Sequence, residues 1–283
     1  MRVQFMGVFM KKILAFGTLA LFSFSVFAVD IFSISQLKEQ IKSYTRTDYS
    51  VTTKFGNYFR TPAAKTTHNF TDGKETEEIH LTPRDVVIRK VIWNYDEEGN
   101  LSEKVCSNAE NELEWKTAMT YKDGVQQDHS EYDSTGNLKN RTIYTYTDEL
   151  LTDKTLYDGE GALLEKTIYT YTDGKKVATI CNYIADGSLR EKQSYAYTVE
   201  GVLDAITYYD KDLNESRVES LRYDENGILA EVTTYVNDKV VKRTLIKYEE
   251  KGNVNRISEY NISDKFGTTV NELVGIAEFA YEY

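Results

Sequence analysis

Histidine offers the widest catalytic and metal-binding chemistry of any residue type, and this chain has three. Metal-dependent hydrolases and catalytic triads need histidines close to carboxylates or to a nucleophile. His68, His80 and His129 stand singly, and His129 occupies an apolar position of an expected strand, which favours a packed structural role. The sequence also contains no nucleophile elbow, phosphate loop or dinucleotide fingerprint. We therefore expect no enzyme, and no catalytic, cofactor-binding or metal-binding residues.

Acidic residues suggest a calcium loop at one place only. The segment Asp210-Lys-Asp212-Leu-Asn214 begins like an EF-hand, but its sixth position is Glu215 and its twelfth is Leu221, where that loop needs Gly and Glu. We interpret it as a polar turn. The paired acids elsewhere fall at expected turns, and nothing selects two of them as a glycosidase pair.

The two cysteines are predicted to be free. Cys106 and Cys181 fall at positions of opposite parity in the periodic pattern described below, so they should point to opposite faces of a sheet. They are also about six strands apart, which at ~4.8 Å per strand is roughly 29 Å in a flat sheet. A disulfide needs Cα atoms within about 7 Å of each other. We expect two packed thiols.

The N-terminus resembles a secretion signal. Arg2, Lys11 and Lys12 precede an apolar stretch over 13–27, and Val26-Phe27-Ala28 supplies small residues for cleavage. Removing residues 1–28 takes away three positive charges, so the net charge changes from −11 to −14. Such an acidic chain is a poor partner for nucleic acid or anionic lipid. We predict an exported protein, in the periplasm, at the cell surface or secreted, without a membrane span in the mature chain.

Tyrosine and glycine recur at fixed spacing through the mature chain. An aromatic residue is followed by a polar turn with Gly and then by an aliphatic residue six positions later, as in Tyr223-Asp-Glu-Asn-Gly227-Ile-Leu229. These anchor positions, aromatic except for Ser107, form two interleaved series, and the step within each is 25 or 26 residues. They are Phe70, Tyr95, Tyr121, Tyr146, Tyr171, Tyr197, Tyr223 and Tyr248, and Ser107, Tyr132, Tyr157, Tyr183, Tyr209, Tyr235 and Tyr260. This spacing predicts one β-hairpin per step.

The residues of the turn explain the spacing. Asp first and Gly fourth suit a type I turn followed by a left-handed residue, a common three-residue hairpin loop. That loop pairs Asp224 with Ile228 and Tyr223 with Leu229. Counting in twos from the aromatic positions predicts one face rich in tyrosine and a second face with a single apolar column, three residues before each aromatic; this column comprises Ile92, Ile143, Ile168, Ile180, Ile206, Val232, Leu245 and Ile257.

Tandem Tyr-Asp-x-x-Gly-x-Leu resembles the YD (RHS) repeat family and the MORN-like repeats of bacteria. The resemblance covers about residues 70–265 and is carried by Tyr95-Asp96…Gly99…Leu101, Tyr132-Asp133…Gly136…Leu138 and Tyr223-Asp224…Gly227…Leu229. It implies successive antiparallel hairpins in an extended or curling sheet. It departs from both families in its longer period, and it has no Gly-x-Trp step.

These observations predict an all-β fold, one long twisted or curling meander of tandem hairpins. Residues 1–28 are the signal, 29–69 a cap segment and 70–283 the hairpin array. Ser33 to Gln36 resemble a capping box, so we expect a short helix over about 34–44 that covers the first edge of the sheet.

The function we expect is non-enzymatic binding, adhesion or envelope scaffolding through the aromatic face, with an unknown protein or polysaccharide as partner. The candidate binding residues are Tyr144, Tyr146, Tyr169, Tyr171, Tyr195 and Tyr197. The same rings could instead only pack across strands and stabilise the sheet. Alternatives are an outer-membrane β-barrel, which charges on both faces oppose, and an immunity or antitoxin-like partner of a secreted toxin. The oligomeric state stays open.

Overall fold

The computed structural model describes residue 37, residues 40–211 and residues 215–283. Strands make up every regular element of this part of the chain: β1 (Ser43–Lys54), β2 (Asn57–Thr71), β3 (Lys74–Leu81), β4 (Val87–Tyr95), β5 (Leu101–Asn108), β6 (Leu113–Lys122), β7 (Val125–Asp133), β8 (Leu138–Thr147), β9 (Leu150–Asp158), β10 (Leu163–Tyr171), β11 (Val177–Ile184), β12 (Leu189–Tyr197), β13 (Leu203–Asp210), β14 (Glu215–Tyr223), β15 (Leu229–Val236), β16 (Lys239–Tyr248), β17 (Val254–Lys265) and β18 (Thr268–Glu282). The all-β prediction agrees with this.

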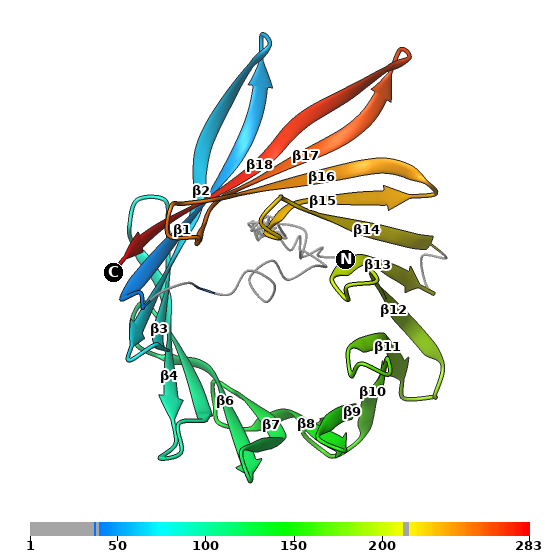
Figure 1. The fold of residues 1–283 in the computed structure, drawn as a ribbon. Helices are drawn as coiled ribbons and strands as arrows, with labels where there is room; N and C mark the ends of the chain where they lie inside the picture. The colour runs from blue at the N-terminus through cyan, green and yellow to red at the C-terminus, as the bar shows by residue number, and fades with distance from the viewer. Residues whose placement is uncertain (1–36, 38–39, 212–214) are drawn as a thin grey trace, which may run out of the picture.

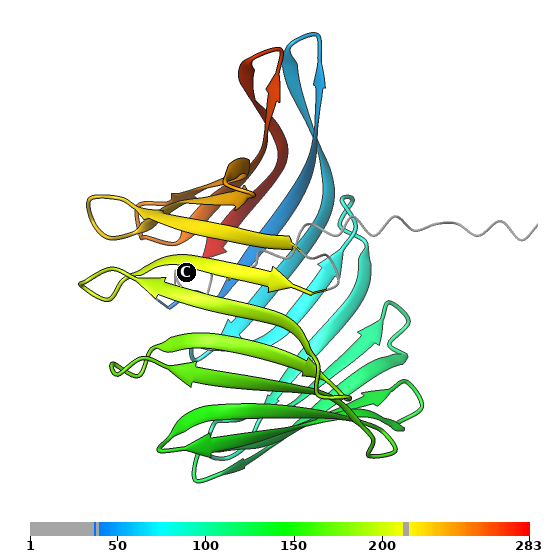
Figure 2. The same ribbon diagram turned by 90° about the vertical axis from the view of Figure 1, so that its right-hand side faces the viewer.

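The sheet closes into a barrel. Each strand pairs antiparallel with the next, and β1 also pairs with β18, from Ser43 opposite Glu282 to Ser50 opposite Gly275 (Figures 1 and 2). The predicted open meander is therefore wrong. Closure pairs the two edge strands, which an open sheet would leave exposed. Eighteen strands at ~4.8 Å give a backbone diameter of roughly 27 Å before tilt, and barrels of this size are too wide for side chains to fill.

The predicted N-terminal helix is also wrong. Ser43 and Tyr44, at its expected end, begin β1, and the described residues contain no helix. Strand β18 lies against β1 and so covers the edge that the helix was expected to cover. Five residues of the helix range (34–36, 38 and 39) and the predicted signal at 1–28 lie outside the described residues. Strand β1 and most of β2 occupy the predicted cap segment 29–69.

The predicted turn chemistry is confirmed. At the β14–β15 turn the Asp224 amide donates to the Ile228 carbonyl at 2.8 Å, and the Gly227 amide donates to the Asp224 carbonyl at 3.0 Å. Gly227 has a φ of +75°, the left-handed conformation that this turn requires. Tyr223 then pairs with Leu229, as the spacing predicted.

A β-bulge follows this turn and changes which face the next residues occupy. Tyr223 pairs with Leu229, but Arg222 pairs with Glu231, so Ala230 is an extra residue in β15. One extra residue exchanges the two faces for the rest of the strand. Counting in twos had placed Glu231 on the same face as Leu229, and the structure places Val232 there instead, because Val232 pairs with Leu221. The predicted faces were wrong for this reason.

The bulges separate the two tyrosine series onto opposite faces. Tyr144 and Tyr146 face the lumen, whereas Tyr132 and Tyr157 face outward beside Arg141. Register places the first series in the lumen and the second outside. The predicted apolar column is divided in the same way: Ile92, Ile143, Ile168 and Leu245 face outward, and Ile180, Ile206, Val232 and Ile257 face the lumen.

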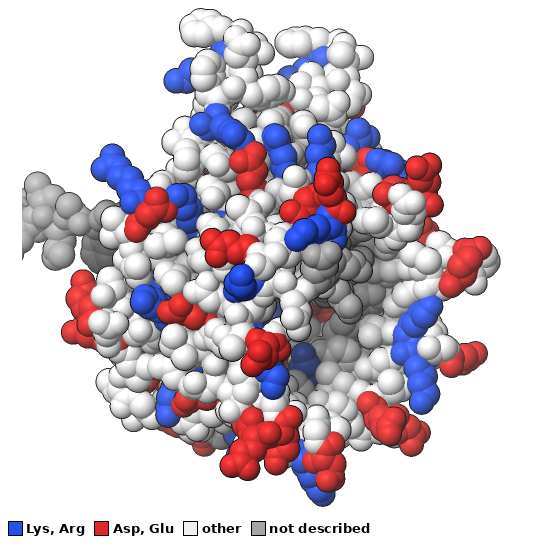
Figure 3. Space-filling view, turned by 60° about the vertical axis from the view of Figure 1, so that its left-hand side comes forward, with Lys and Arg blue, Asp and Glu red and all other residues white. Residues whose placement is uncertain are grey.

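Ion pairs between neighbouring strands run across the outer face. Glu77–Lys90, Glu103–Lys116, Asp128–Arg141 and Asp153–Lys166 join strands β3 to β10 two by two, at 3.9, 3.8, 2.8 and 3.6 Å. In each pair the acid and base are diagonal neighbours, a position from which opposite charges attract across strands. We call these four the outer ion pairs. Figure 3 shows charges of both signs interspersed over this side of the molecule.

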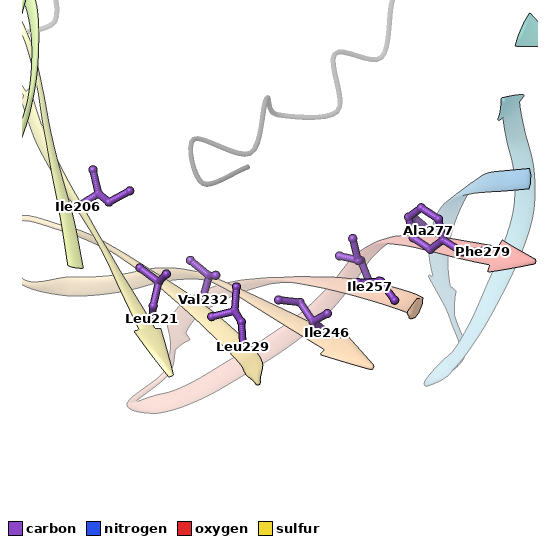
Figure 4. Close-up of a cluster of buried hydrophobic side chains, with 9 residues drawn as sticks. Ile206, Leu221, Leu229, Val232, Ile246, Ile257, Ala277 and Phe279 are labelled. Carbon is purple, nitrogen blue, oxygen red and sulfur yellow. The ribbon is translucent and has the colours of Figure 1, made fainter. Parts of the chain in front are cut away.

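A cluster of buried apolar side chains lines the lumen on one side of the barrel. We call them the lumenal apolar wall: Ile206, Leu221, Leu229, Val232, Ile246, Val254, Ile257, Ala277 and Phe279. Figure 4 shows the labelled members on the concave face of the sheet, from β13 to β18. The apolar core therefore lies inside the curve of the sheet, where ion pairs such as Arg217–Glu219 and Lys242–Glu259 also occur.

Candidate functional site

The six candidate tyrosines share the lumenal face. They come in pairs from β8, β10 and β12, and all six are half-buried: Tyr144, Tyr146, Tyr169, Tyr171, Tyr195 and Tyr197. Register connects them, because Glu165 and Thr167 of β10 pair with the lumenal residues Leu156 and Lys154 of β9. The sequence thus placed these rings on one face, and the structure shows that this face lines the inside of a barrel.

The hydroxyls at the ends of these strands bind backbone. Tyr171 donates to the Leu151 carbonyl at 2.7 Å, and Tyr197 donates to the Val177 carbonyl at 2.8 Å. Both acceptors are bulge residues, opposite Tyr146 and Tyr171 in the preceding hairpin. The same bond recurs around the barrel, from Tyr95 to Glu75, Tyr121 to Leu101, Tyr223 to Leu203, Tyr248 to Leu229 and Tyr281 to Val254.

These bonds have a structural cause. A bulge interrupts the ladder of hydrogen bonds and leaves a backbone group without its usual partner. The tyrosine of the next hairpin supplies a donor to that carbonyl. Burial raises the pKa of Tyr171 and of Tyr197, so these phenols stay protonated and able to donate. The structural role that the sequence left open for the tyrosines is therefore present at these positions.

The rings in the middle of the strands are available for other contacts. The Lys154 ammonium lies 5.6 Å from the Tyr144 ring centroid and 5.5 Å from that of Tyr169, so one cation is shared by two rings. Tyr195 donates to the Gln193 side chain at 2.8 Å. The strip formed by Tyr144, Tyr169 and Tyr195 thus presents half-buried ring surface to the lumen beside a lysine.

A polar cluster occupies the lumenal face of β2 and β3, across the barrel from the strip of Tyr144, Tyr169 and Tyr195. His68 pairs directly with Glu78 across these strands, and its Nδ1 lies 2.6 Å from the Glu75 carboxylate. His80 Nε2 lies 2.7 Å from the Glu78 carboxylate. The hydrogen bond from His80 lowers the pKa of Glu78, which keeps that carboxyl ionised.

Sequence reasoning treated these histidines as isolated, but a signal was present. Asp72-Gly73 is a two-residue turn with φ values of +51° and +75°, and Asp-Gly between strands is typical of such hairpins. This turn pairs Thr71 with Lys74, and one bulge further along it brings His68 opposite Glu78. The cluster contains no cysteine and no residue of the calcium-like loop. Residues 212–214 of that loop lie outside the described residues.

Both cysteines are free, as predicted. Cys106 pairs with Val91 on the lumenal face, whereas Cys181 pairs with the outward-facing Ile168, so the predicted opposite faces are also confirmed. Burial, with a smaller effect of Glu114, raises the pKa of the Cys106 thiol to about 11. The sulfur is therefore protonated and unreactive at neutral pH.

His129 faces the lumen and is half-buried. It pairs with Met119 and Thr142 in neighbouring strands. Burial lowers its pKa and favours the neutral ring, and its buried Nε2 has no hydrogen-bond partner among the described residues. The surroundings agree with the packed role predicted for it.

Comparisons with known proteins assign the chain to no family and find solved structures of low similarity. No family model matches the chain, and no curated protein matches it. A porin-like protein from Bacteroides uniformis is 12% identical over 87% of this chain and 99% of its own, with a TM-score of 0.48. A porin-like protein from Bacteroides vulgatus is 11% identical over 86% of this chain and 98% of its own, with a TM-score of 0.31. A DUF1329 family protein from Desulfovibrio piger is 11% identical over 89% of this chain and 88% of its own, with a TM-score of 0.25.

The resemblance to YD (RHS) and MORN-like proteins is wrong. That resemblance implied an open or curling array of hairpins, and the sheet is a closed barrel. The Tyr-Asp-x-x-Gly-x-Leu motif is explained by its turn and, for the lumenal tyrosines such as Tyr95 and Tyr223, by the bond to a bulge carbonyl.

Among the described residues, none forms a helix with the length and apolar character needed to cross a bilayer.

Proposed function

We propose that the protein is an exported, non-enzymatic barrel that binds an amphipathic ligand in its lumen and exposes its outer face to water. The observation that carries the proposal is the division between the two faces of the sheet. Outside, the outer ion pairs lie near the middle of β3 to β10. Inside, tyrosine rings and the lumenal apolar wall follow one another from β8 to β18, with the ion pairs Arg217–Glu219 and Lys242–Glu259 among them.

The outward charges support a water-exposed outer face. A barrel in a membrane needs an outward apolar band about 25 Å tall, and charged residues at mid-depth are costly there. Asp153 and Lys166 stand in the middle of β9 and β10 and face outward. Each of these strands is about 30 Å long at ~3.4 Å per residue, so no band of that height avoids the charges.

The lumenal tyrosines of β8, β10 and β12 favour apolar contact with a ligand. Tyr171, Tyr195 and Tyr197 already donate their hydroxyls within the barrel, so they offer ring surface rather than free hydrogen-bonding groups. The ammonium of Lys154 stands beside the rings of Tyr144 and Tyr169 and supplies a positive charge. A ligand with an apolar body and a polar or anionic end fits this combination better than a polysaccharide does.

Binding of anilinonaphthalene sulfonate, which is apolar and anionic, tests this with the purified mature chain. We expect fluorescence enhancement that a lipid extract displaces, and weaker binding in Y144A and Y169A. Y157A is the matched control, because Tyr157 lies in an adjacent strand and faces outward. Absence of probe binding, or equal loss in Y157A, would contradict the proposal.

An outer-membrane barrel is the second candidate. Closure of the sheet favours it, and so do outward tyrosines at the ends of every second strand, which resemble one aromatic girdle: Tyr132, Tyr157, Tyr183, Tyr209 and Tyr235. Cell fractionation separates the candidates. Release of the mature protein without detergent supports the water-exposed barrel, and retention in the outer membrane until detergent is added supports the alternative.

A further inference from the structure

The polar cluster on β2 and β3 has the composition of a metal site. The donor atoms of His68, Glu75 and Glu78 all lie within 4.8 Å of one another. His80 adds a second imidazole, in contact with Glu78. The geometry points to a divalent transition-metal site in the barrel lumen, with these four side chains as ligands and Zn²⁺ as the fitting ion.

The donors suit that ion. Zn²⁺ is bound by imidazole nitrogen and carboxylate oxygen, and four ligands complete its tetrahedral shell. All four side chains come from two paired strands, so the register of the hairpin sets their spacing. A site built on strands is held more precisely than one on loops.

Surrounding side chains hold the first ligand in place. The Tyr44 ring stacks on the His68 ring with centroids 4.4 Å apart and planes inclined by 15°. Tyr95 donates to the Glu75 carbonyl at 2.8 Å and so fixes the backbone that carries the second ligand. Contacts of this kind orient metal ligands and raise affinity.

Lys104 is the competing cation. Its ammonium lies 3.5 Å from the Trp93 ring centroid, and the charges of Glu75 and Glu78 act on it. Without metal, this lysine balances part of the charge of the two carboxylates. A bound cation must share them with Lys104, so removing the lysine charge favours metal binding.

Isothermal titration of the full mature chain with Zn²⁺ tests the site. We expect one equivalent to bind, with affinity at least tenfold weaker in H68Q and in E75Q, weaker in H80Q, and severalfold tighter in K104M. H129Q is the matched control, because His129 faces the same lumen from β7 and should leave the affinity unchanged. Circular dichroism of each variant establishes that the barrel has formed.

Co²⁺ provides a second readout. Its absorption spectrum should show nitrogen and oxygen ligation, without a thiolate charge-transfer band. Failure of both the native chain and K104M to take up metal would overturn the proposal. So would uptake that H68Q retains and the double variant C106S/C181S loses, because the ion would then be bound by cysteine.

Two hairpins, β1–β2 and β17–β18, project beyond the barrel. Both extend past the rest of the sheet (Figures 1 and 2), and their tips diverge from each other in Figure 1. Each ends in Lys-Phe-Gly, and Phe55 and Phe266 are 101% and 106% exposed. Both phenylalanines have a φ of +53°, which is rare and strained for a bulky side chain.

The other turns of this kind use polar residues. Two-residue turns with two positive φ values also occur at 72–73, 123–124, 148–149 and 237–238, and there the first residue is Asp or Asn. These residues tolerate the left-handed conformation. Phenylalanine occupies that position only at the two projecting tips among the described turns, where it is strained and packs against nothing. Folding therefore does not account for it.

We infer that the two tips insert into a phospholipid bilayer and dock the barrel on a membrane surface. Both tips project at one end of the barrel, so they can reach one plane. Lys54 and Lys265 precede the phenylalanines and are exposed, where they can meet lipid phosphates while the rings enter the apolar boundary. This docking leaves the outer ion pairs in water.

Co-sedimentation with vesicles tests the inference. Vesicles of the zwitterionic lipids phosphatidylethanolamine and phosphatidylcholine should bind the native chain. F55N/F266N should bind at least tenfold more weakly without a lower thermal midpoint, because Asn suits the turn. V199N is the control, since Val199 is 99% exposed at another turn. The inference would be overturned if the native chain did not bind the vesicles, even if it bound a protein instead. Equal vesicle binding by F55N/F266N and the native chain would overturn it too.

Discussion

Replacing Tyr171 with phenylalanine removes one hydroxyl and leaves the ring in place. That hydroxyl donates to the Leu151 carbonyl at 2.7 Å, between part-buried groups. A hydrogen bond of this kind contributes about 0.5–1.5 kcal/mol net to the free energy of unfolding. The carbonyl left without a donor adds a further cost only where water cannot reach it. Because the site is half-buried, we expect Y171F to lower the free energy of unfolding by about 1 kcal/mol.

Equilibrium unfolding in urea measures this loss, and a thermal scan should show a midpoint lower by roughly 2–4 °C for a chain of this size. Y169F is the control, since the Tyr169 ring lies beside Lys154 on the same face. Y121F should cost as much as Y171F, and the double variant should be additive, because the two sites are about 19 Å apart around the sheet. A loss in Y171F no larger than in Y169F would refute the role assigned to the bulge carbonyls.

Two further substitutions and one chemical probe test the strand register and the faces. G159A should destabilise the barrel by about 1–3 kcal/mol, because a Cβ there would lie 2.0 Å from the Leu138 carbonyl oxygen. G174A should change stability little, because a Cβ there would lie 3.8 Å from its nearest neighbour. Equal effects of the two substitutions in denaturant unfolding would contradict the packing. A thiol reagent at pH 8 should label Cys181 and spare Cys106, which is 0% exposed and has its pKa raised to about 11, so its reactive thiolate forms only as the pH approaches that value. Rapid labelling of both in the native protein would show that the lumenal face is open at Cys106.

The hairpins could be predicted because their signal is local. Asp224 and Gly227 define a turn whose geometry pairs Tyr223 with Leu229, and the same residues recur along the chain. The bulge after Leu229 could not be read in the same way, because Ala230 has no distinctive chemistry. Missing it exchanged the two faces in the prediction.

Closure and the polar cluster depend on longer-range pairing. Whether β18 reaches β1 follows from the twist and register of all the strands together, and residues 43–50 carry none of the turn-linked tyrosine pattern. The contact of His68 with Glu75 and Glu78 needs the Asp72-Gly73 turn and also the bulge that follows it, since the turn alone would pair His68 with Glu77. It was missed because the histidines were compared with each other and not with the carboxylates across the hairpin.

The native Cys181 allows the most direct measurement of which face meets water. It lies within β11 on the outer face and, in a C106S background, is the one thiol available for a nitroxide label. Collision rates with oxygen and with a water-soluble nickel complex would be measured in envelope preparations. We predict strong relaxation by nickel; high oxygen with low nickel accessibility would place this face in lipid and contradict the account.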